Sequence, residues 1–137
     1  MTETSLDKLQ PWVAQRAQAW LEMAQAYVLP LAFPGCKTRV TETLRTLERQ
    51  SELQADKKSA VTVGFHNFGR AFDFICLDEH GVLIGDGTHP IYRTLGLLGE
   101  TLGLYWGGRF SDYDHLEDRS HGTVAELSAR GAAGLDT

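Results

Sequence analysis

The sequence predicts a single α+β domain with a small, mostly antiparallel sheet and flanking helices. Helical periodicity marks both ends of the core, and short apolar or alternating runs lie between them. Helices and strands separated in this way favour an α+β arrangement. The chain has 137 residues, 42% of them hydrophobic, which suffices for one core. We expect one domain over residues 1–137, with its core at about 5–117 and a C-terminal tail at 118–137.

The first predicted helix follows Thr4 and Ser5, two residue types that cap helices. Apolar residues then recur at helical spacing: Leu6, Leu9, Val13, Trp20, Ala24 and Tyr27. Pro11 is tolerated only in the first turns, so the helix start can shift toward residue 10. The stretch "VLPLAFPG" contains two prolines and a glycine and predicts the end of this helix.

The elements that follow alternate between strand and helix signals. Residues 37–44 are rich in β-branched side chains and predict a strand, and residues 45–56 are strong helix formers. Residues 60–86 read as strands joined by tight turns. Pro90 opens a helix that ends at Gly103. Its apolar stripe consists of Ile91, Tyr92, Leu95, Leu98 and Leu102. "LYWGGRF" then predicts a strand or turn.

Composition excludes several classes of partner. Thirteen basic and eighteen acidic residues give a net charge of −5, and the longest basic cluster is Lys57 and Lys58, so we expect no nucleic-acid binding. No secretory signal and no membrane-spanning run are present, which predicts a cytoplasmic protein without stable membrane association. Cys36 and Cys76 lack CxxC spacing and are expected to be free, structural thiols.

One carboxylate interrupts an apolar run. An ionised Asp73 between Phe72 and Phe74 loses hydration that a cation, a metal or several hydrogen bonds must replace. His66 lies seven residues earlier, and His115 lies beyond the last long helix. Two imidazoles and one carboxylate supply the three protein ligands of a catalytic zinc site, whose fourth position holds water. On spacing alone, a buried aspartate that is hydrogen-bonded to a turn remains the commoner explanation.

The motifs "HNFGRAFD", "WGG" and a final Asp-x-x-His resemble those of zinc peptidases that include D-alanyl-D-alanine carboxypeptidases and the L-alanyl-D-glutamate endopeptidases of bacteriophage lysis. The likeness spans about residues 38–117. It is closest to the endopeptidase branch, where HNxGxAxD, LGLxWGG and DxxHxE occur in this order. The resemblance implies the fold of the hedgehog and D-Ala-D-Ala-peptidase type with a bound Zn2+.

The resemblance also implies a metal centre and a base. It assigns His66, Asp73 and His115 as zinc ligands and Asp112 as the general base. Zinc would polarise the scissile carbonyl and lower the pKa of water, and a carboxylate would carry the proton to the leaving amine. Asp114, next to the histidine, is expected to be solvated or turn-forming.

Further roles follow from the resemblance. Arg45 opens an Arg-Thr-x-x-x-Gln stretch and is implied to act in catalysis by binding or polarising substrate oxygens, for which a permanently charged fork is suited. A solvated Arg45 is the alternative. Gln50 is expected to orient substrate or brace the loop. Trp106 is expected to line the cleft or pack beneath the zinc loop, and Glu117 is a candidate hydrogen-bond partner of a zinc histidine.

Two departures from the family pattern leave the ligands intact. Gly64 stands where relatives often carry Ser, and Leu116 stands where they often carry Phe. The other histidines, His80, His89 and His121, are expected to be ordinary surface residues.

These observations predict a zinc-dependent peptidoglycan endopeptidase that cuts the stem peptide between L-alanine and D-glutamate. We expect a monomeric phage or prophage endolysin that reaches the wall after a separate protein permeabilises the membrane. A D-alanyl-D-alanine carboxypeptidase is one alternative, and a non-catalytic, zinc-bearing murein-binding module is another. Asp112 favours catalysis, because a module that only binds has no need of a base.

Overall fold

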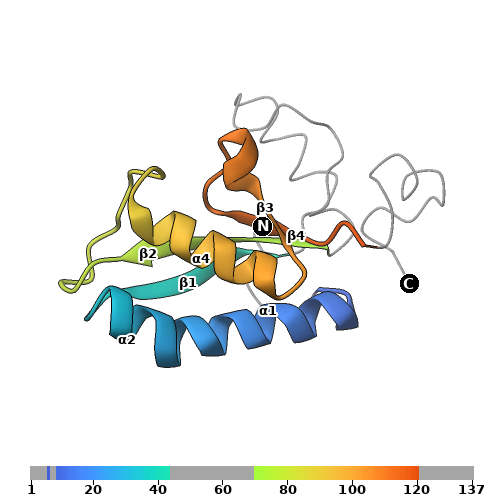
Figure 1. Ribbon diagram of the computed structural model, residues 1–137, viewed down its shortest axis with the longest axis horizontal. Coiled ribbons are helices and arrows are strands. Elements are labelled where there is room, and N and C mark those ends of the chain that lie inside the picture. Colours follow the sequence, from blue (N-terminus) through green and yellow to red (C-terminus); the bar gives the residue numbers. More distant parts are fainter. Residues whose placement is uncertain (1–5, 7–8, 44–69, 121–137) are drawn as a thin grey trace.

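The computed structural model describes residue 6 and residues 9–43 and 70–120 of the chain (Figure 1). The helix predicted at 45–56, the strand signal at 60–69 and the C-terminal stretch 121–137 lie outside these residues.

The described strands form one four-stranded sheet in the order β1-β2-β4-β3. Every neighbouring pair is antiparallel. The strands are β1 (Lys37–Glu42), β2 (Ala71–Leu77), β3 (Tyr105–Trp106) and β4 (His115–Glu117). The fold class predicted from the sequence, α+β with an antiparallel sheet and flanking helices, is confirmed.

Helix α1 (Pro11–Met23) begins with its proline at the first helical position, where no backbone N–H is needed. The chain then continues without a break through the π-helical η2 (Ala24–Val28) and the short α2 (Leu29–Ala32). The sequence predicts that both prolines of "VLPLAFPG" close the helix, but Pro30 lies inside α2 and only Pro34 follows its end. The wider π-helical turn directly before α2 places Pro30 in a first turn, where its missing N–H costs little.

Helix α4 (Pro90–Thr101) agrees with its predicted bounds. His89 caps it, because its Nδ1 accepts a hydrogen bond of 3.1 Å from the backbone N–H of Ile91. The chain leaves the helix at Gly103, which has a φ of +89° that favours glycine.

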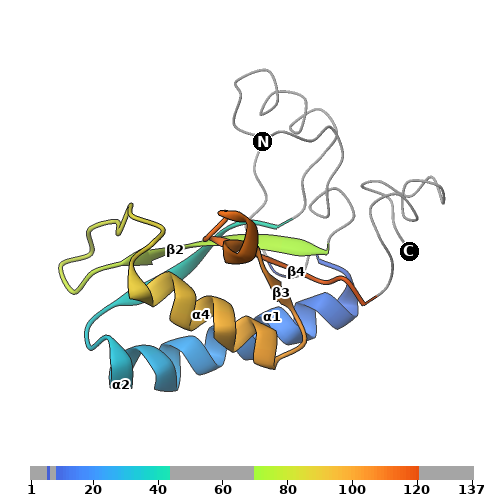
Figure 2. The ribbon, with the colours of Figure 1, turned by 45° about the horizontal axis from the view of Figure 1, so that its top comes forward.

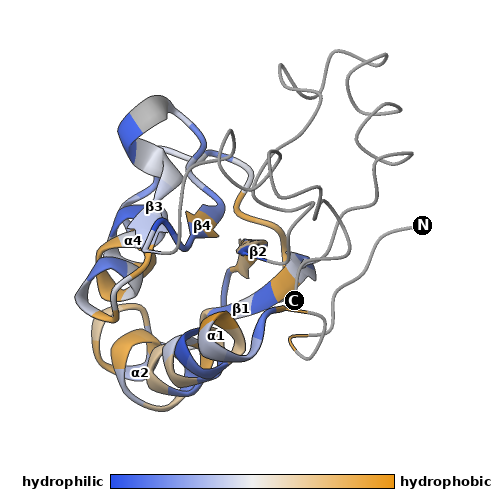
Figure 3. Ribbon diagram, turned by 90° about the vertical axis from the view of Figure 1, so that its right-hand side faces the viewer, coloured by the Kyte–Doolittle hydropathy of each residue, from blue (hydrophilic) through white to orange (hydrophobic). Residues whose placement is uncertain are grey.

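The helices cover one face of the sheet and enclose the core with it. Helices α1 and α4 run along the same side of the strands in two views (Figures 1 and 2), and Figure 3 shows the helices curving around that face. Trp20 of α1 donates to the Leu95 carbonyl of α4 at 2.9 Å, and its ring contacts Phe72 and Phe74 of β2. Since side chains alternate along a strand, Asp73 and Ile75 point to the opposite face.

A buried carboxylate joins the start of α1 to the end of the sheet. Asp118 is fully buried and accepts hydrogen bonds from Trp12 Nε1 at 2.9 Å and Ser120 N at 3.0 Å. Arg16 Nη1 lies 3.3 Å from the same carboxylate. Packing against α1 therefore continues past β4.

Cys36 is half-buried and Cys76 is buried, and both are free thiols, as predicted. In the described ranges, no helix combines the length and the apolar character that crossing a membrane requires.

Candidate active site

The register of the sheet brings two of the predicted metal ligands together. Asp73 of β2 is the direct cross-strand partner of His115 of β4. Facing residues in an antiparallel pair extend to the same side of the sheet, with Cβ atoms roughly 5 Å apart. Leu116, the next residue, points into the core and is fully buried. Both side chains therefore lie on the sheet face opposite the one that the described helices cover.

The two ring nitrogens of His115 meet different carboxylates. Nδ1 lies 3.0 Å from Oδ1 of Asp73, and Nε2 lies 2.7 Å from Oε1 of Glu117. Asp112 is farther away, with its Oδ2 at 3.8 Å from Nδ1. Glu117 and His115 are two residues apart on the same strand, so alternation places them on one face. The hydrogen-bond role predicted for Glu117 matches this geometry.

Burial and these carboxylates control the charges at the site. Burial alone would lower the pKa of His115, but hydrogen bonds to Asp73 and Glu117 outweigh it and raise the pKa to about 10. Burial alone would raise the pKa of Glu117, but its hydrogen bonds with His115 and Arg119 lower it. With its pKa raised in this way, His115 carries a positive charge between the carboxylates of Asp73 and Glu117. A metal bound by the histidine would replace one of its protons.

Of the two predictions for Asp114, solvated or turn-forming, the structure fits the second, because Asp114 lies in the turn before β4. It is half-buried, and its carbonyl accepts a hydrogen bond of 2.8 Å from the backbone N–H of Phe74. Burial, together with the nearby carboxylates of Asp73 and Asp112, raises the pKa of Asp114 to about 7. The loop before β4 thus adds a third aspartate to the site.

A tight turn presents Asp112 at the entrance of the site. Ser111 adopts a left-handed backbone conformation, with a φ of 69°, after the 3-10 helix η4 (Gly107–Phe110). The Asp112 amide then donates to the carbonyl of Gly107 at 2.8 Å. A Cβ atom at Gly107 would lie 2.5 Å from the Asp112 carbonyl oxygen and 3.1 Å from Cβ of His115. The first glycine of "WGG" therefore allows the loop to close.

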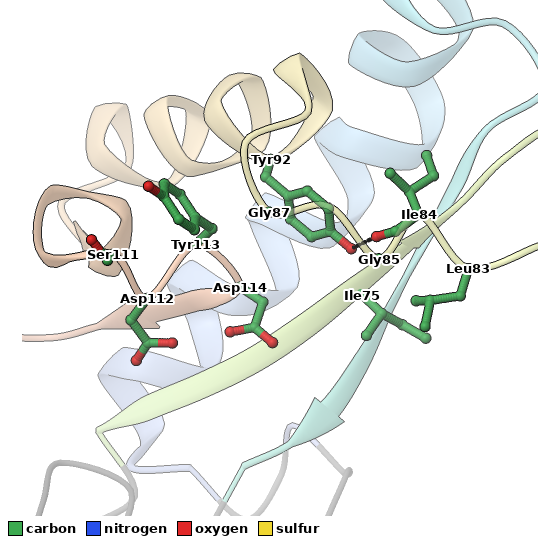
Figure 4. Close-up of a pocket in the computed structure, with 10 residues that line it drawn as sticks. All are labelled: Ile75, Leu83, Ile84, Gly85, Gly87, Tyr92, Ser111, Asp112, Tyr113 and Asp114. Atoms are coloured by element: carbon green, nitrogen blue, oxygen red, sulfur yellow. Dashed lines mark hydrogen bonds between the residues drawn. The ribbon is translucent and has the colours of Figure 1, made fainter. Parts of the chain in front are cut away.

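A cavity of about 290 Å3 lies beside these aspartates (Figure 4). Asp112 and Asp114 line one end of it, and Ile75 and Leu83 line the other. Tyr92 forms part of the wall and is fixed by a hydrogen bond of 2.7 Å from its hydroxyl to the carbonyl of Ile84. The cavity thus joins an acidic end to an apolar end.

Trp106 supports the loop from the core. It is 7% exposed, and its Nε1 donates to the Tyr113 carbonyl at 2.9 Å. A Cβ atom at Gly96 of α4 or at Gly108 would collide with its ring. Of the two roles predicted for Trp106, this position fits packing beneath the loop.

The described donors fit a zinc centre in part. Asp73 and His115 offer an oxygen and a nitrogen on one face, and the second nitrogen of the histidine is held by a carboxylate, as is usual for metal-bound histidines. Within residues 9–43 and 70–120, no three His, Cys, Asp or Glu residues are grouped to hold a metal. The third predicted ligand, His66, lies outside the described residues, as do Arg45 and Gln50.

Sequence reasoning missed two contributors to the site. The sequence marks Gly107 as part of the "WGG" motif but does not predict that it is the spacer under the loop. Arg119 was assigned to the tail, although it donates to Oε2 of Glu117 at 2.6 Å and lies 3.6 Å from the centre of the Tyr105 ring. The signal for Arg119 was its spacing, because His115, Glu117 and Arg119 alternate along an extended segment.

Comparisons with known proteins agree with this fold. No protein-family profile matches the chain, and no curated protein does. Among solved structures, the chain is similar to the L-Ala D-Glu endopeptidase ChiX of Serratia marcescens, with a TM-score of 0.62 and 19% sequence identity. The match covers 85% of this chain and 87% of that one. The chain therefore has the α+β fold of a known peptidase.

Proposed function

We propose that the chain is a zinc-dependent peptidoglycan endopeptidase. The observation that carries the proposal is the cross-strand pair of Asp73 and His115, 3.0 Å apart. Asp112, which lines a cavity, lies 3.8 Å from the same histidine. The fold shared with an L-Ala D-Glu endopeptidase supports the same reading. The sequence motifs supply the third ligand, His66.

Asp73, His115 and His66 would hold the metal. Zinc at this position would act as a Lewis acid on the scissile carbonyl and activate a water molecule. Glu117 occupies Nε2 of His115, so Nδ1 is the nitrogen that faces Asp73 and would bind the metal. The carboxylate of Glu117 thus orients the proposed zinc ligand His115.

Asp112 is proposed as the general base. About half of its side chain is exposed, and it lines the cavity, so it can meet both water and substrate. It accepts a proton from the attacking water and passes that proton to the leaving amine. Arg45 is proposed to bind substrate oxygens, and Gln50 to orient the peptide.

The cavity suits a short peptide. Its apolar end, at Ile75 and Leu83, can hold an alanine methyl group, and Tyr92 gives it a rigid wall. We propose that the L-alanyl-D-glutamate bond of the stem peptide is the one hydrolysed. We further propose that the protein is a phage or prophage endolysin, made in the cytoplasm and released to the wall when the membrane is permeabilised.

Digestion of purified peptidoglycan tests the proposal. The products are identified by mass spectrometry, and the D112N variant serves as the inactive control. We expect peptides with a new N-terminal D-glutamate. Release of free D-alanine alone would show a carboxypeptidase, and binding of zinc-loaded protein to murein without any soluble product would show a binding module.

A further inference from the structure

We propose that Arg119 is a positioning residue for the metal centre, which it serves through Glu117 and His115. The inference rests on the proposed function, because it concerns the zinc ligand His115. It assigns a role to a residue beyond the Asp-x-x-His motif, on the segment that follows β4.

The two oxygens of the Glu117 carboxylate have separate partners. Oε1 meets Nε2 of His115 at 2.7 Å, and Oε2 accepts a hydrogen bond from Nε of Arg119 at 2.6 Å. Glu117 is 4% exposed, so a rotation of its carboxylate would break bonds that water cannot replace. Arg119 thereby fixes the plane of the carboxylate that holds the histidine ring.

Arg119 is itself held by the sheet. Its guanidinium lies 3.6 Å from the centre of the Tyr105 ring. Tyr105 of β3 is the cross-strand partner of Glu117, so the ring and the carboxylate extend on the same side of the sheet. The stacked guanidinium therefore has one preferred position, although about half of the side chain is exposed.

These contacts determine which ring nitrogen of His115 is available to a metal. With Nε2 bonded to Glu117, Nδ1 is the nitrogen that faces Asp73 at 3.0 Å. Loss of Arg119 would free Glu117 to turn and would loosen the ring. Partners that orient metal-bound histidines in this way typically change metal affinity 10-fold to 100-fold when removed.

A simple charge argument predicts the opposite effect. Arg119 is a cation near the position of Zn2+, and its removal should strengthen zinc binding if charge alone mattered. Positioning predicts weaker binding. The sign of the change therefore separates the two explanations.

The test measures zinc affinity of the full chain by competition with a chelating dye in wild type, R119A and R109A. Arg109 is a matched control, since it is also about half exposed and pairs with a different glutamate, Glu100 of α4, instead of Glu117. We expect R119A to bind zinc roughly 10-fold or more weakly, and R109A to bind like wild type. Nitrogen NMR of His115 in zinc-loaded wild type should show metal at Nδ1 and a proton at Nε2.

The outcomes are distinguishable from failure of the proposed function. If wild type binds no zinc, the proposed function fails. If wild type binds zinc and R119A binds it equally or more tightly, or if R109A loses as much affinity as R119A, the positioning role is wrong. If circular dichroism shows that R119A does not fold, zinc affinity is measured in E117Q instead. This substitution keeps the shape of the Glu117 side chain and removes the charge that Arg119 contacts. An unchanged zinc affinity in E117Q would also overturn the proposal.

Discussion

At the scale of single residues, the three aspartates around His115 differ in what surrounds them. Asp73 faces Nδ1 of the histidine across the strands, at 3.0 Å. Asp112 is about half exposed and lines the cavity, whereas Asp114 is half-buried and has a pKa raised to about 7 by burial and its neighbours. The same side chain is thus suited to ligation at one position and to proton transfer at another.

The first prediction separates Asp112 from Asp114. D112N keeps the shape of the side chain and removes the base, so the rate of peptidoglycan hydrolysis should fall by roughly 10²-fold to 10⁴-fold while zinc content is retained. D114N should change the rate only modestly. Initial rates and metal analysis of both variants check this, and a dead D114N beside an active D112N would reverse the assignment.

The second prediction concerns the two thiols. Burial raises the pKa of Cys76 to about 12, so this thiol stays protonated from pH 7 to 9 and its reactive thiolate forms only above that range. Cys36 is half-buried and accessible. Iodoacetamide at pH 8 should therefore modify Cys36 in the folded protein and Cys76 only after unfolding. Mass spectrometry of the labelled peptides checks the order, which early labelling of Cys76 would contradict.

At the scale of elements, the sheet register and the loop after β3 assemble the site. The pairing of β2 with β4 sets Asp73 against His115, and Gly107 lets the turn with Asp112 close over β3. A loop of this kind, supported by a rigid sheet, can hold the proposed base, Asp112, in a fixed position.

The third prediction tests the spacing at Gly107. In G107A the new Cβ would lie 2.5 Å from a backbone oxygen of Asp112, so the loop must shift. We expect a loss of about 1–3 kcal/mol in the free energy of unfolding, the usual cost of overpacking. Zinc affinity should fall as well. The control is G85A, because a Cβ at Gly85 meets no atom within 4 Å. If G107A and G85A have the same free energy of unfolding and the same zinc affinity, Gly107 is not a spacer.

The sequence predicts most of the helix boundaries. Pro11 and Pro90 mark the starts of α1 and α4 because proline suits a first turn, and Gly103 marks the exit from α4 because of its positive φ. The prediction that Pro30 ends the helix is wrong, because the continuation of a helix through a π-helical turn depends on packing that leaves no local signal in the sequence. The register that pairs Asp73 with His115 joins residues 42 positions apart, and spacing alone cannot give it.

At the scale of the whole molecule, the two faces of the sheet have different roles. One face, with Phe72 and Phe74, packs on the helices and holds the core. The other face carries Asp73 and His115. A fully buried Asp118 fastens the end of this arrangement to α1 through Trp12 and Arg16. The rigid core thus supports the polar site, and two core residues, Tyr92 and Trp106, also contact the cavity and the loop beside it.

We propose that zinc held by His115 and Asp73 drives cleavage of peptidoglycan. The most direct measurement is the release of soluble peptide from purified peptidoglycan by the wild-type chain before treatment with a chelator, after it, and after readdition of Zn2+, with bound zinc determined in each sample. The account predicts one zinc per chain, loss of release on chelation, and recovery with zinc. Full release by a sample that contains no metal would contradict it.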